Sequence, residues 1–253
     1  ISGSLEYASR KPLFNTSNFV VFGRDIPFQS NNPIDPTNFT APFNTHNIAS
    51  LNIGTSIVFD QKYVSYPNRK INFDNSRYPS LSIRYRKNFG SNVSEYNSNV
   101  LISNIRQNFS MGNLGEFNYN IRSGIFFEKK DIAFMDYLHA NGNQLKLAPS
   151  NRNSSFGLLN YYKFSTNDKY AEVHLEHNFK GRLLRNIPLL NTLNFHVVAN
   201  AKGLFTGGIK PYSEFSLGLD NIGIGKWRFL RIDYVRSNFN GKKGDGFLFG
   251  ISF

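Results

Sequence analysis

The chain reads GFLFGISF over residues 246–253, and this stretch decides the fold class. Side chains two positions apart in a β-strand point to the same face. One face of the segment is therefore a continuous apolar stripe of Phe247, Phe249, Ile251 and Phe253. Termini of soluble domains normally fray and carry polar residues, whereas the last strand of a membrane barrel pairs with another strand and leaves no open edge in lipid. The stretch predicts an all-β fold, an antiparallel transmembrane β-barrel, of which it is the final strand.

Composition agrees with a barrel and excludes several other classes. The 253 residues show no internal repeat and contain no run of 18 or more apolar residues, which excludes a membrane-spanning helix. A mean hydropathy of -0.38 would suit a soluble protein, but barrel strands alternate lipid-facing and lumen-facing residues and therefore look polar on average. The 25 Phe and 13 Tyr suit a lipid-facing surface with interfacial aromatic girdles. The absence of Cys excludes disulfides, Cys-ligated metals and a thiol nucleophile.

The net charge of +12 makes nucleic-acid binding the main soluble alternative. The cations are dispersed along the predicted strands, however, and form no long basic helix and no RNA-binding signature. Lumen-facing positions and loops beside acidic lipid head groups account for them. We therefore expect no nucleic-acid partner.

Period-two segments recur upstream of the terminal stripe, at about the length of 9 to 11 residues that a tilted strand needs to cross a bilayer. They predict about 10–12 strands in this chain. The tight turn at residues 112–115 predicts a hairpin between two of them. The segments are Leu5 to Ser9, Phe19 to Gly23, Leu51 to Phe59, Leu81 to Phe89, Val100 to Phe109, Phe117 to Phe127, Ala171 to Lys180, Leu193 to Lys202, Phe215 to Leu219 and Trp227 to Asn238.

Strand direction constrains the connections, because outer-membrane barrels keep the C-terminus and short turns in the periplasm and long loops outside. If residues 156–165 formed a spanning strand, the tight turn at 112–115 would fall outside and a long connection would fall in the periplasm. We therefore interpret residues 129–169 as one long outer loop. Residues 24–47 then form an external connection, and residues 61–79 an unusually long periplasmic one.

Several short segments resemble a known family over about residues 50–253. They resemble an outer-membrane barrel family of Bacteroidota whose function is unassigned and which joins an N-terminal carboxypeptidase-regulatory-like domain to a C-terminal barrel. The order of the last segments is more distantly similar to the BamA/TamA superfamily, whose barrels insert or translocate proteins. The segments are residues 63–67, 78–81, 141–143, 176–181, 187–190 and 231–234, with 216–219 and the terminal Phe for the distant likeness.

The resemblance implies a barrel of roughly 16 strands and a long loop, here 129–169, that folds back into the lumen. We expect residues 1–253 to be the C-terminal part of one barrel domain, with targeting signals and about four strands upstream. The superfamily loop carries an Arg-Gly-aromatic motif, whereas the nearest region here reads Ser154-Ser155-Phe156-Gly157. Insertase activity is therefore left open. The terminal stripe also resembles the signal that the outer-membrane assembly machinery reads.

His174, Glu176 and His177 form the most site-like cluster in the sequence. In a strand, His174 and Glu176 share one face and His177 points to the other, so the two imidazoles do not converge on a metal. Asp131, Asp136 and His139 in the long loop are the residues on which a surface enzyme would depend. We find no arrangement of a nucleophile with a base, and we expect no catalysis, no metal and no cofactor.

Charged residues on the inward faces are expected to pair with one another or to hold the inward-folded loop. The sequence as a whole leaves three functions open. The chain is a barrel for envelope protein assembly or translocation, a structural or channel component of a larger outer-membrane complex, or, less favoured, a surface enzyme. The expected location is the outer membrane of a Gram-negative bacterium. The expected partners are its lipid and lipopolysaccharide, the assembly machinery and other envelope proteins. The inward residues are Arg84, Arg86, Arg122, Glu172, Glu176, Arg231 and Asp233.

Overall fold

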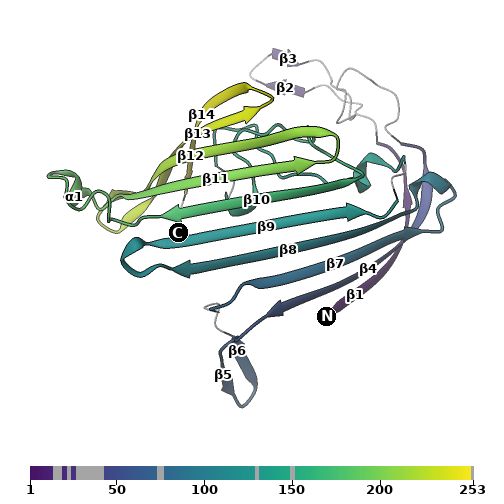
Figure 1. Cartoon of the computed structure of the whole chain (residues 1–253). Helices are drawn as coiled ribbons and strands as arrows, with labels where there is room; N and C mark the ends of the chain where they lie inside the picture. The colour runs from purple at the N-terminus through teal and green to yellow at the C-terminus, as the bar shows by residue number, and fades with distance from the viewer. Residues whose placement is uncertain are drawn as a thin grey trace.

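One large, curved antiparallel sheet makes up most of the molecule (Figure 1). The computed structural model describes residues 1–13, 19–21, 24–26, 43–72, 77–128, 131–148 and 152–251. The sheet has ten strands, each paired with its neighbours in chain order. They are β1 (Ser2–Arg10), β4 (His46–Val58), β7 (Ser80–Phe89), β8 (Ser98–Ser110), β9 (Glu116–Phe126), β10 (Lys169–Asn178), β11 (His196–Thr206), β12 (Ile209–Ile224), β13 (Trp227–Phe239) and β14 (Lys242–Ile251).

The remaining elements are small. Two short ribbons pair β2 (Phe19–Val21) with β3 (Arg24–Ile26) and β5 (Tyr63–Tyr66) with β6 (Arg69–Asn72). The helical turns are η1 (Ser94–Tyr96), η2 (Gly112–Leu114), η3 (Phe134–Asp136), η4 (Arg152–Ser154) and α1 (Leu190–Leu193). No helix in the described part of the chain is both long and apolar enough to cross a membrane.

The ten strands of the sheet are all predicted from the sequence, including the β8–β9 hairpin around η2. The strand predicted at Phe19 to Gly23 does not join the sheet: among the described residues it is reduced to the three residues of β2, which pair with β3 and are too few to cross a bilayer. One boundary is wrong. The sequence predicts a strand that begins at Leu193, but Leu193 ends α1, and β11 begins at His196. Leu189 and Asn194 flank the helical turn with positive φ values of 73° and 51°, a conformation that breaks an extended strand before β11.

Closure of the sheet into a barrel is not found among the described residues. β1 and β14 are the two edges of the ten-stranded sheet, and no ladder joins them. What is confirmed is the all-β class, the antiparallel order of the sheet and, among the described residues 131–148 and 152–168, the absence of a strand from the connection between β9 and β10.

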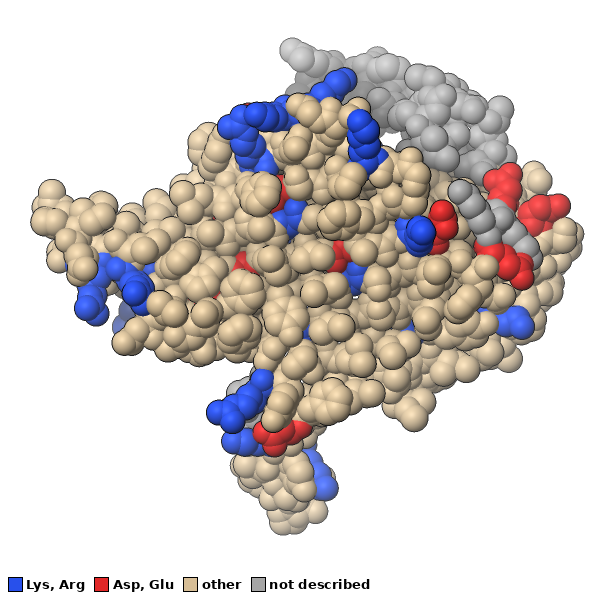
Figure 2. Space-filling model, viewed as in Figure 1, with Lys and Arg blue, Asp and Glu red and all other residues tan. Residues whose placement is uncertain are grey.

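The two faces of the sheet have opposite character. Apolar side chains on the outer face remain exposed from strand to strand; for example, Leu217 lies opposite Tyr234 and Tyr234 opposite Phe247. The terminal stripe belongs to this surface, with Phe247, Phe249 and Ile251 exposed by 58%, 47% and 54%, whereas Phe253 lies outside the described residues. Figure 2 shows a broad surface over the strands with charged side chains mainly around its margins. Contiguous apolar exposure on this scale marks a surface that something else covers.

Candidate functional site

The concave face of β8 to β13 packs against the long connection between β9 and β10. We call the described part of this connection, residues 131–148 and 152–168, the inner loop. Its Phe156, Leu159 and Phe164 are almost fully buried, in one apolar cluster with side chains of the sheet. The contributions of the sheet are Val100, Phe126, Tyr170, Leu204 and Tyr212. This cluster is the main core of the molecule, and it ties the inner loop to the sheet.

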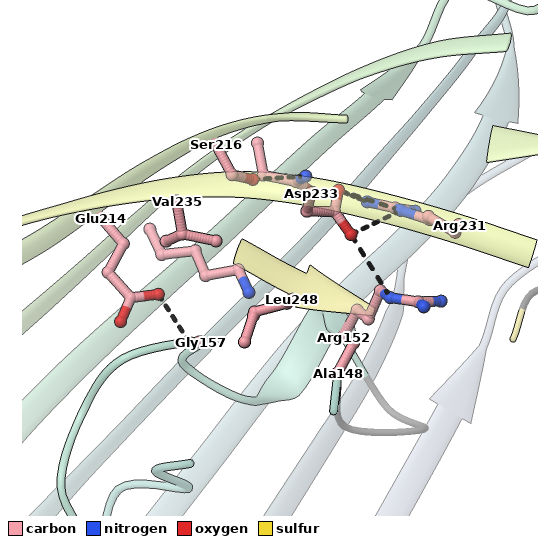
Figure 3. A pocket seen from close by; sticks show the side chains of 11 residues that line it. Ala148, Arg152, Gly157, Glu214, Ser216, Arg231, Asp233, Val235 and Leu248 are labelled. Atoms are coloured by element: carbon pink, nitrogen blue, oxygen red, sulfur yellow. Dashed lines mark hydrogen bonds and ion pairs between the residues drawn. The ribbon is translucent and has the colours of Figure 1, made fainter. Parts of the chain in front are cut away.

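Glu214 of β12 holds the turn at the centre of the inner loop (Figure 3). Its carboxylate accepts hydrogen bonds from the backbone N–H groups of Gly157 at 2.6 Å and Leu158 at 2.8 Å. The Tyr212 hydroxyl donates a third at 2.6 Å. Glu214 is 1% exposed, and a buried carboxylate is stable when several donors satisfy its oxygens. The arrangement therefore fixes residues 157 and 158 against the sheet.

Lys202 of β11, the strand next to β12, binds the same turn of the inner loop. Its ammonium donates to the backbone oxygen of Ser155 at 2.7 Å. Asn120 of β9 adds a hydrogen bond from its side-chain amide to the backbone oxygen of Asn153 at 2.8 Å. These donors bond main-chain atoms of the loop, so the contact depends on the path of its backbone more than on its side chains.

Glycines on the inward face of β14 make room for the inner loop. A Cβ at Gly246 would lie 2.8 Å from Leu158 Cδ2, and a Cβ at Gly250 would lie 2.1 Å from Arg152 Nη2 and 3.0 Å from Ala148 Cβ. Any side chain at these two positions would displace the inner loop. The small residues that alternate with the terminal stripe thus have a packing role.

The inner loop also covers part of the free edge of β14. Leu147 forms a parallel bridge with Phe249. Ala148 N–H donates to Phe249 O at 2.7 Å, and Phe249 N–H donates to Lys146 O at 2.9 Å. Arg152 Nη1 donates to Ile251 O at 3.2 Å. Backbone groups at the C-terminal end of this edge strand are therefore satisfied by the chain's own loop.

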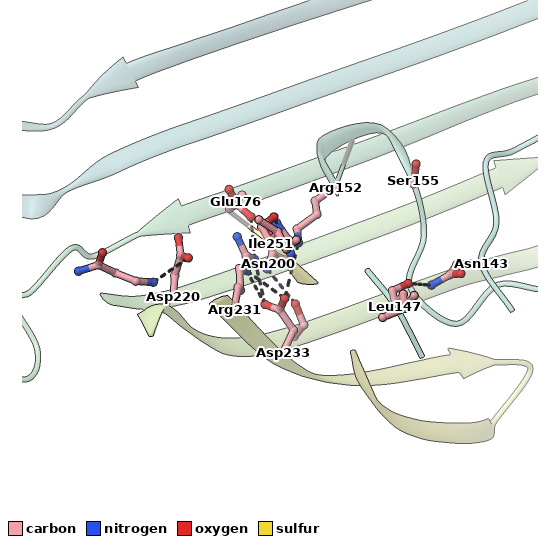
Figure 4. Close-up of polar contacts among 12 residues, drawn as sticks. Asn143, Leu147, Arg152, Ser155, Glu176, Asn200, Asp220, Arg231, Asp233 and Ile251 are labelled. Carbon is pink, nitrogen blue, oxygen red and sulfur yellow. Dashed lines mark hydrogen bonds and ion pairs between the residues drawn. The ribbon is translucent and has the colours of Figure 1, made fainter. Parts of the chain in front are cut away.

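A buried charge network lies beside these contacts (Figure 4). Arg231 of β13 binds Asp233 through Nε and Nη2 at 2.9–3.0 Å, and its Nη2 also lies 2.9 Å from Glu176 Oε2. Arg152 of the inner loop also approaches Asp233, with Nε 3.8 Å from Oδ2. Arg152, Arg231, Asp233, Lys202 and Glu214 line a cavity of about 20 Å³, which is room for about one water molecule.

Asp136 fixes the other end of the inner loop to β1 and β7. Its carboxylate forms an ion pair with Arg10 at 2.7 Å, and its backbone oxygen accepts a hydrogen bond from Arg86 Nη2 at 2.9 Å. Nearby, His139 Nδ1 lies 2.7 Å from Ser165 Oγ within the loop. Burial lowers the pKa of His139 below its usual 6.5. The Asp136 carboxylate is thus committed to a structural ion pair.

Of the predicted inward residues, Arg86 and Asp233 contact the inner loop. Glu176 and Arg231 join Asp233 in the buried network, and Arg122 pairs with Glu172 at 3.5 Å within the sheet. Arg84 lines an open hollow with Ser2, Ser4 and Asn52 at the other side of the concave face.

The sequence pattern does not single out five side chains of this site: Glu214, Lys202, Arg152, Asn120 and Arg10. A signal for the first two was present, because Glu214 alternates with the outward Phe215 and Lys202 with the outward Ala201. No comparable signal exists for Arg152, since loop residues have no period.

The His174–His177 cluster is divided as the strand period predicts. His174 is 1% exposed on the concave face, with its ring centroid 4.8 Å from that of Phe156. Its Nε2 lies 3.9 Å from Glu172 Oε2. His177 is on the outer face and bonds the backbone oxygen of Leu114 at 2.8 Å. No group of three or more His, Cys, Asp or Glu residues in the described ranges is placed to hold a metal.

A known protein family matches most of the chain. Residues 1–219 match the C-terminal domain of a family of unknown function, DUF5686. The chain belongs to this family. No curated protein and no solved structure matches it. The family match includes every strand from β1 to β11 and Glu214 of β12, but it ends before Arg231 and the terminal stripe. A relationship to the BamA/TamA superfamily is not among the matches and stays a prediction.

Proposed function

We propose that this chain forms the wall of a non-catalytic outer-membrane β-barrel that acts in envelope protein assembly or translocation. The observation that carries the proposal is the placement of the inner loop: it is bound to the concave face through Glu214, while the convex face exposes an apolar surface. Apolar outside and polar inside is the arrangement of a membrane barrel. A loop that is held inside the barrel by hydrogen bonds to its main chain would block the diffusion of solutes through the lumen.

The edge of β14 supports a role with protein partners. On one edge of β14, the inner loop hydrogen-bonds the backbone N–H and C=O groups of Phe249 and the C=O group of Ile251. The other edge of β14 pairs with β13 along its length. An incompletely covered edge strand is able to pair with another strand. Strand pairing at such an edge suits a barrel that binds and translocates extended polypeptides.

A channel within a larger envelope complex is the second candidate. The hollow around Arg84, lined by Ser2, Ser4, Asn52 and Gly54, favours it, because small polar residues and a cation would line a narrow anion-favouring path. The ion pair between Asp136 and Arg10 disfavours the enzyme alternative, because it engages one of the loop carboxylates on which that alternative depends.

Two measurements test the proposal. Depleting the protein in its host should lower the levels of other outer-membrane or surface proteins, as judged by quantitative proteomics of isolated outer membranes. The purified full-length protein should conduct weakly in planar bilayers, because the inner loop occludes the interior. Unchanged envelope protein levels together with a large, stable, anion-selective conductance would replace the assembly proposal with the channel.

A further inference from the structure

The β5–β6 ribbon projects from the sheet (Figure 1), and its side chains form an uncovered amphipathic surface. Its strands pair with each other and belong to no larger sheet. All eight strand residues are exposed, including Tyr63, Val64, Tyr66 and Ile71 at 40–55%. A two-stranded hairpin is at best marginally stable in water by itself. A ribbon that displays its apolar side chains in this way is expected to rest on another surface.

The register separates the ribbon into two unlike faces. Residues directly opposite in an antiparallel pair share a face. Val64 lies opposite Ile71 and Tyr66 opposite Arg69, which makes one face apolar with a cation at its end. Ser65 lies opposite Lys70 on the other face. The Arg69 guanidinium lies 5.7 Å from the Tyr66 ring centroid, and Lys70 Nζ lies 4.8 Å from that of Tyr63, so both cations lie over tyrosine rings.

The position of the ribbon indicates what this surface meets. It follows the end of β4 at Val58, which pairs with Ser80 of β7, and Ser80 pairs with Arg106 of β8. The same end of the sheet carries the short η2 turn and the β12–β13 turn, where Ile224 and Trp227 are exposed by 88% and 76%. The ribbon therefore lies at the margin of the apolar outer surface, at the end with the short turns.

The charge of the ribbon favours an anionic surface. Residues 59–72 hold Lys62, Arg69 and Lys70 against one acid, Asp60. Tyrosine with flanking Lys and Arg is typical of the bilayer interface, where rings lie at head-group depth and cations meet acidic lipids. We propose that the β5–β6 ribbon is a membrane-interface anchor whose Val64, Tyr66 and Ile71 face enters the anionic phospholipid leaflet next to the short-turn end. This inference rests on the proposed membrane location.

The lack of cysteine in the chain permits a direct test. Single substitutions Ile71→Cys and Val64→Cys on the apolar face, and Ser65→Cys on the polar face, would each carry an environment-sensitive fluorophore. The full-length protein would be reconstituted in vesicles of phosphatidylethanolamine and brominated phosphatidylglycerol. We expect quenching by the brominated chains to be several-fold stronger at residues 64 and 71 than at residue 65. Each of Arg69→Glu and Lys70→Glu should weaken the partition of the ribbon by about fivefold.

A label at Leu217→Cys on the outer face separates this inference from the proposed function. If the label at residue 217 is quenched and the labels at residues 64 and 71 are not, the ribbon is not a membrane anchor, but the sheet is still the wall of a membrane barrel. If residue 217 is unquenched, the membrane wall itself is wrong. Equal quenching at residues 65 and 71 would overturn the amphipathic orientation. Labels shielded only after an envelope protein fraction is added would assign the ribbon to a protein partner and overturn the anchor.

Discussion

Leu147, in the long connection between β9 and β10, forms a parallel β-bridge with Phe249 of the last strand. The remainder of the sheet is antiparallel, so this bridge is a contact of a different kind from the ladder around it. It joins a segment about one hundred residues upstream to the edge of β14. The loop thereby protects an edge that would otherwise present unpaired N–H and C=O groups.

The first prediction concerns Glu214. Glu214→Ala removes the acceptor of two loop N–H groups and of Tyr212, which leaves buried donors unsatisfied and weakens the docking of the inner loop by about 2 kcal/mol or more. Limited proteolysis should cleave residues 131–168 faster in this variant while the strands stay protected. Glu116→Ala is the matched control, because Glu116 pairs with Lys180 in an exposed ion pair. Equal cleavage in the two variants would argue against Glu214 as a holding residue.

The inward residues illustrate how far the sequence can predict this site. Strict alternation along the strands predicted which charges point inward, and the apolar-outside pattern located the terminal stripe. The apolar cluster on the same inward face was not predicted, because Val100, Phe126 and Leu204 pack against a loop that has no period. The partner of each inward charge could not be predicted either. Glu214 and Glu172 both lie on inward faces of strands, but Glu214 binds backbone N–H groups of the inner loop, whereas Glu172 pairs with Arg122 of the sheet.

The second prediction concerns the small residues of β14. Gly250→Val would place carbon atoms where Arg152 and Ala148 lie, so the bridge at Phe249 should open and the loop should become accessible to protease. Gly3→Val in β1 is the control, since a Cβ there meets nothing nearer than Asn52 O at 3.9 Å. Protection of the loop in both variants would mean that the close approach at residue 250 is not required.

The third prediction concerns pH. Burial lowers the pKa of His139, so the docked loop favours the neutral imidazole. The undocked loop then binds protons more readily, and docking loses stability as the pH falls from above 6.5 through the lowered pKa. Proteolysis of the inner loop should therefore increase on acidification through this range. The His139→Gln variant should lose that dependence, and an unchanged profile in the variant would assign the effect to another group.

The fourth prediction concerns the buried network. Asp233→Ala deprives Arg231 of its bidentate partner while leaving Glu176, and breaking a buried ion pair in this way costs about 3 kcal/mol. Denaturant unfolding of the purified protein should show a lower midpoint than the wild type. The exposed pair of Arg236 and Asp245, 3.6 Å apart, provides the control, because Asp245→Ala should change stability by less than about 1 kcal/mol. Equal losses in the two variants would contradict a special role for the network.

A disulfide between the inner loop and β14 tests the central claim most directly. Leu147 of the loop and Phe249 of β14 are bridge partners with exposed side chains, and adjacent strands lie about 4.8 Å apart, a Cα separation that a disulfide spans. Because residues 1–253 contain no cysteine, the pair Leu147→Cys and Phe249→Cys should form a disulfide in membranes isolated from the host, seen as a shift in migration in a non-reducing gel that a reductant reverses. Formation of the bond is the predicted result. Free thiols at both positions, with the exposed cross-strand pair Tyr234→Cys and Phe247→Cys oxidised as a positive control, would contradict an inward-folded loop.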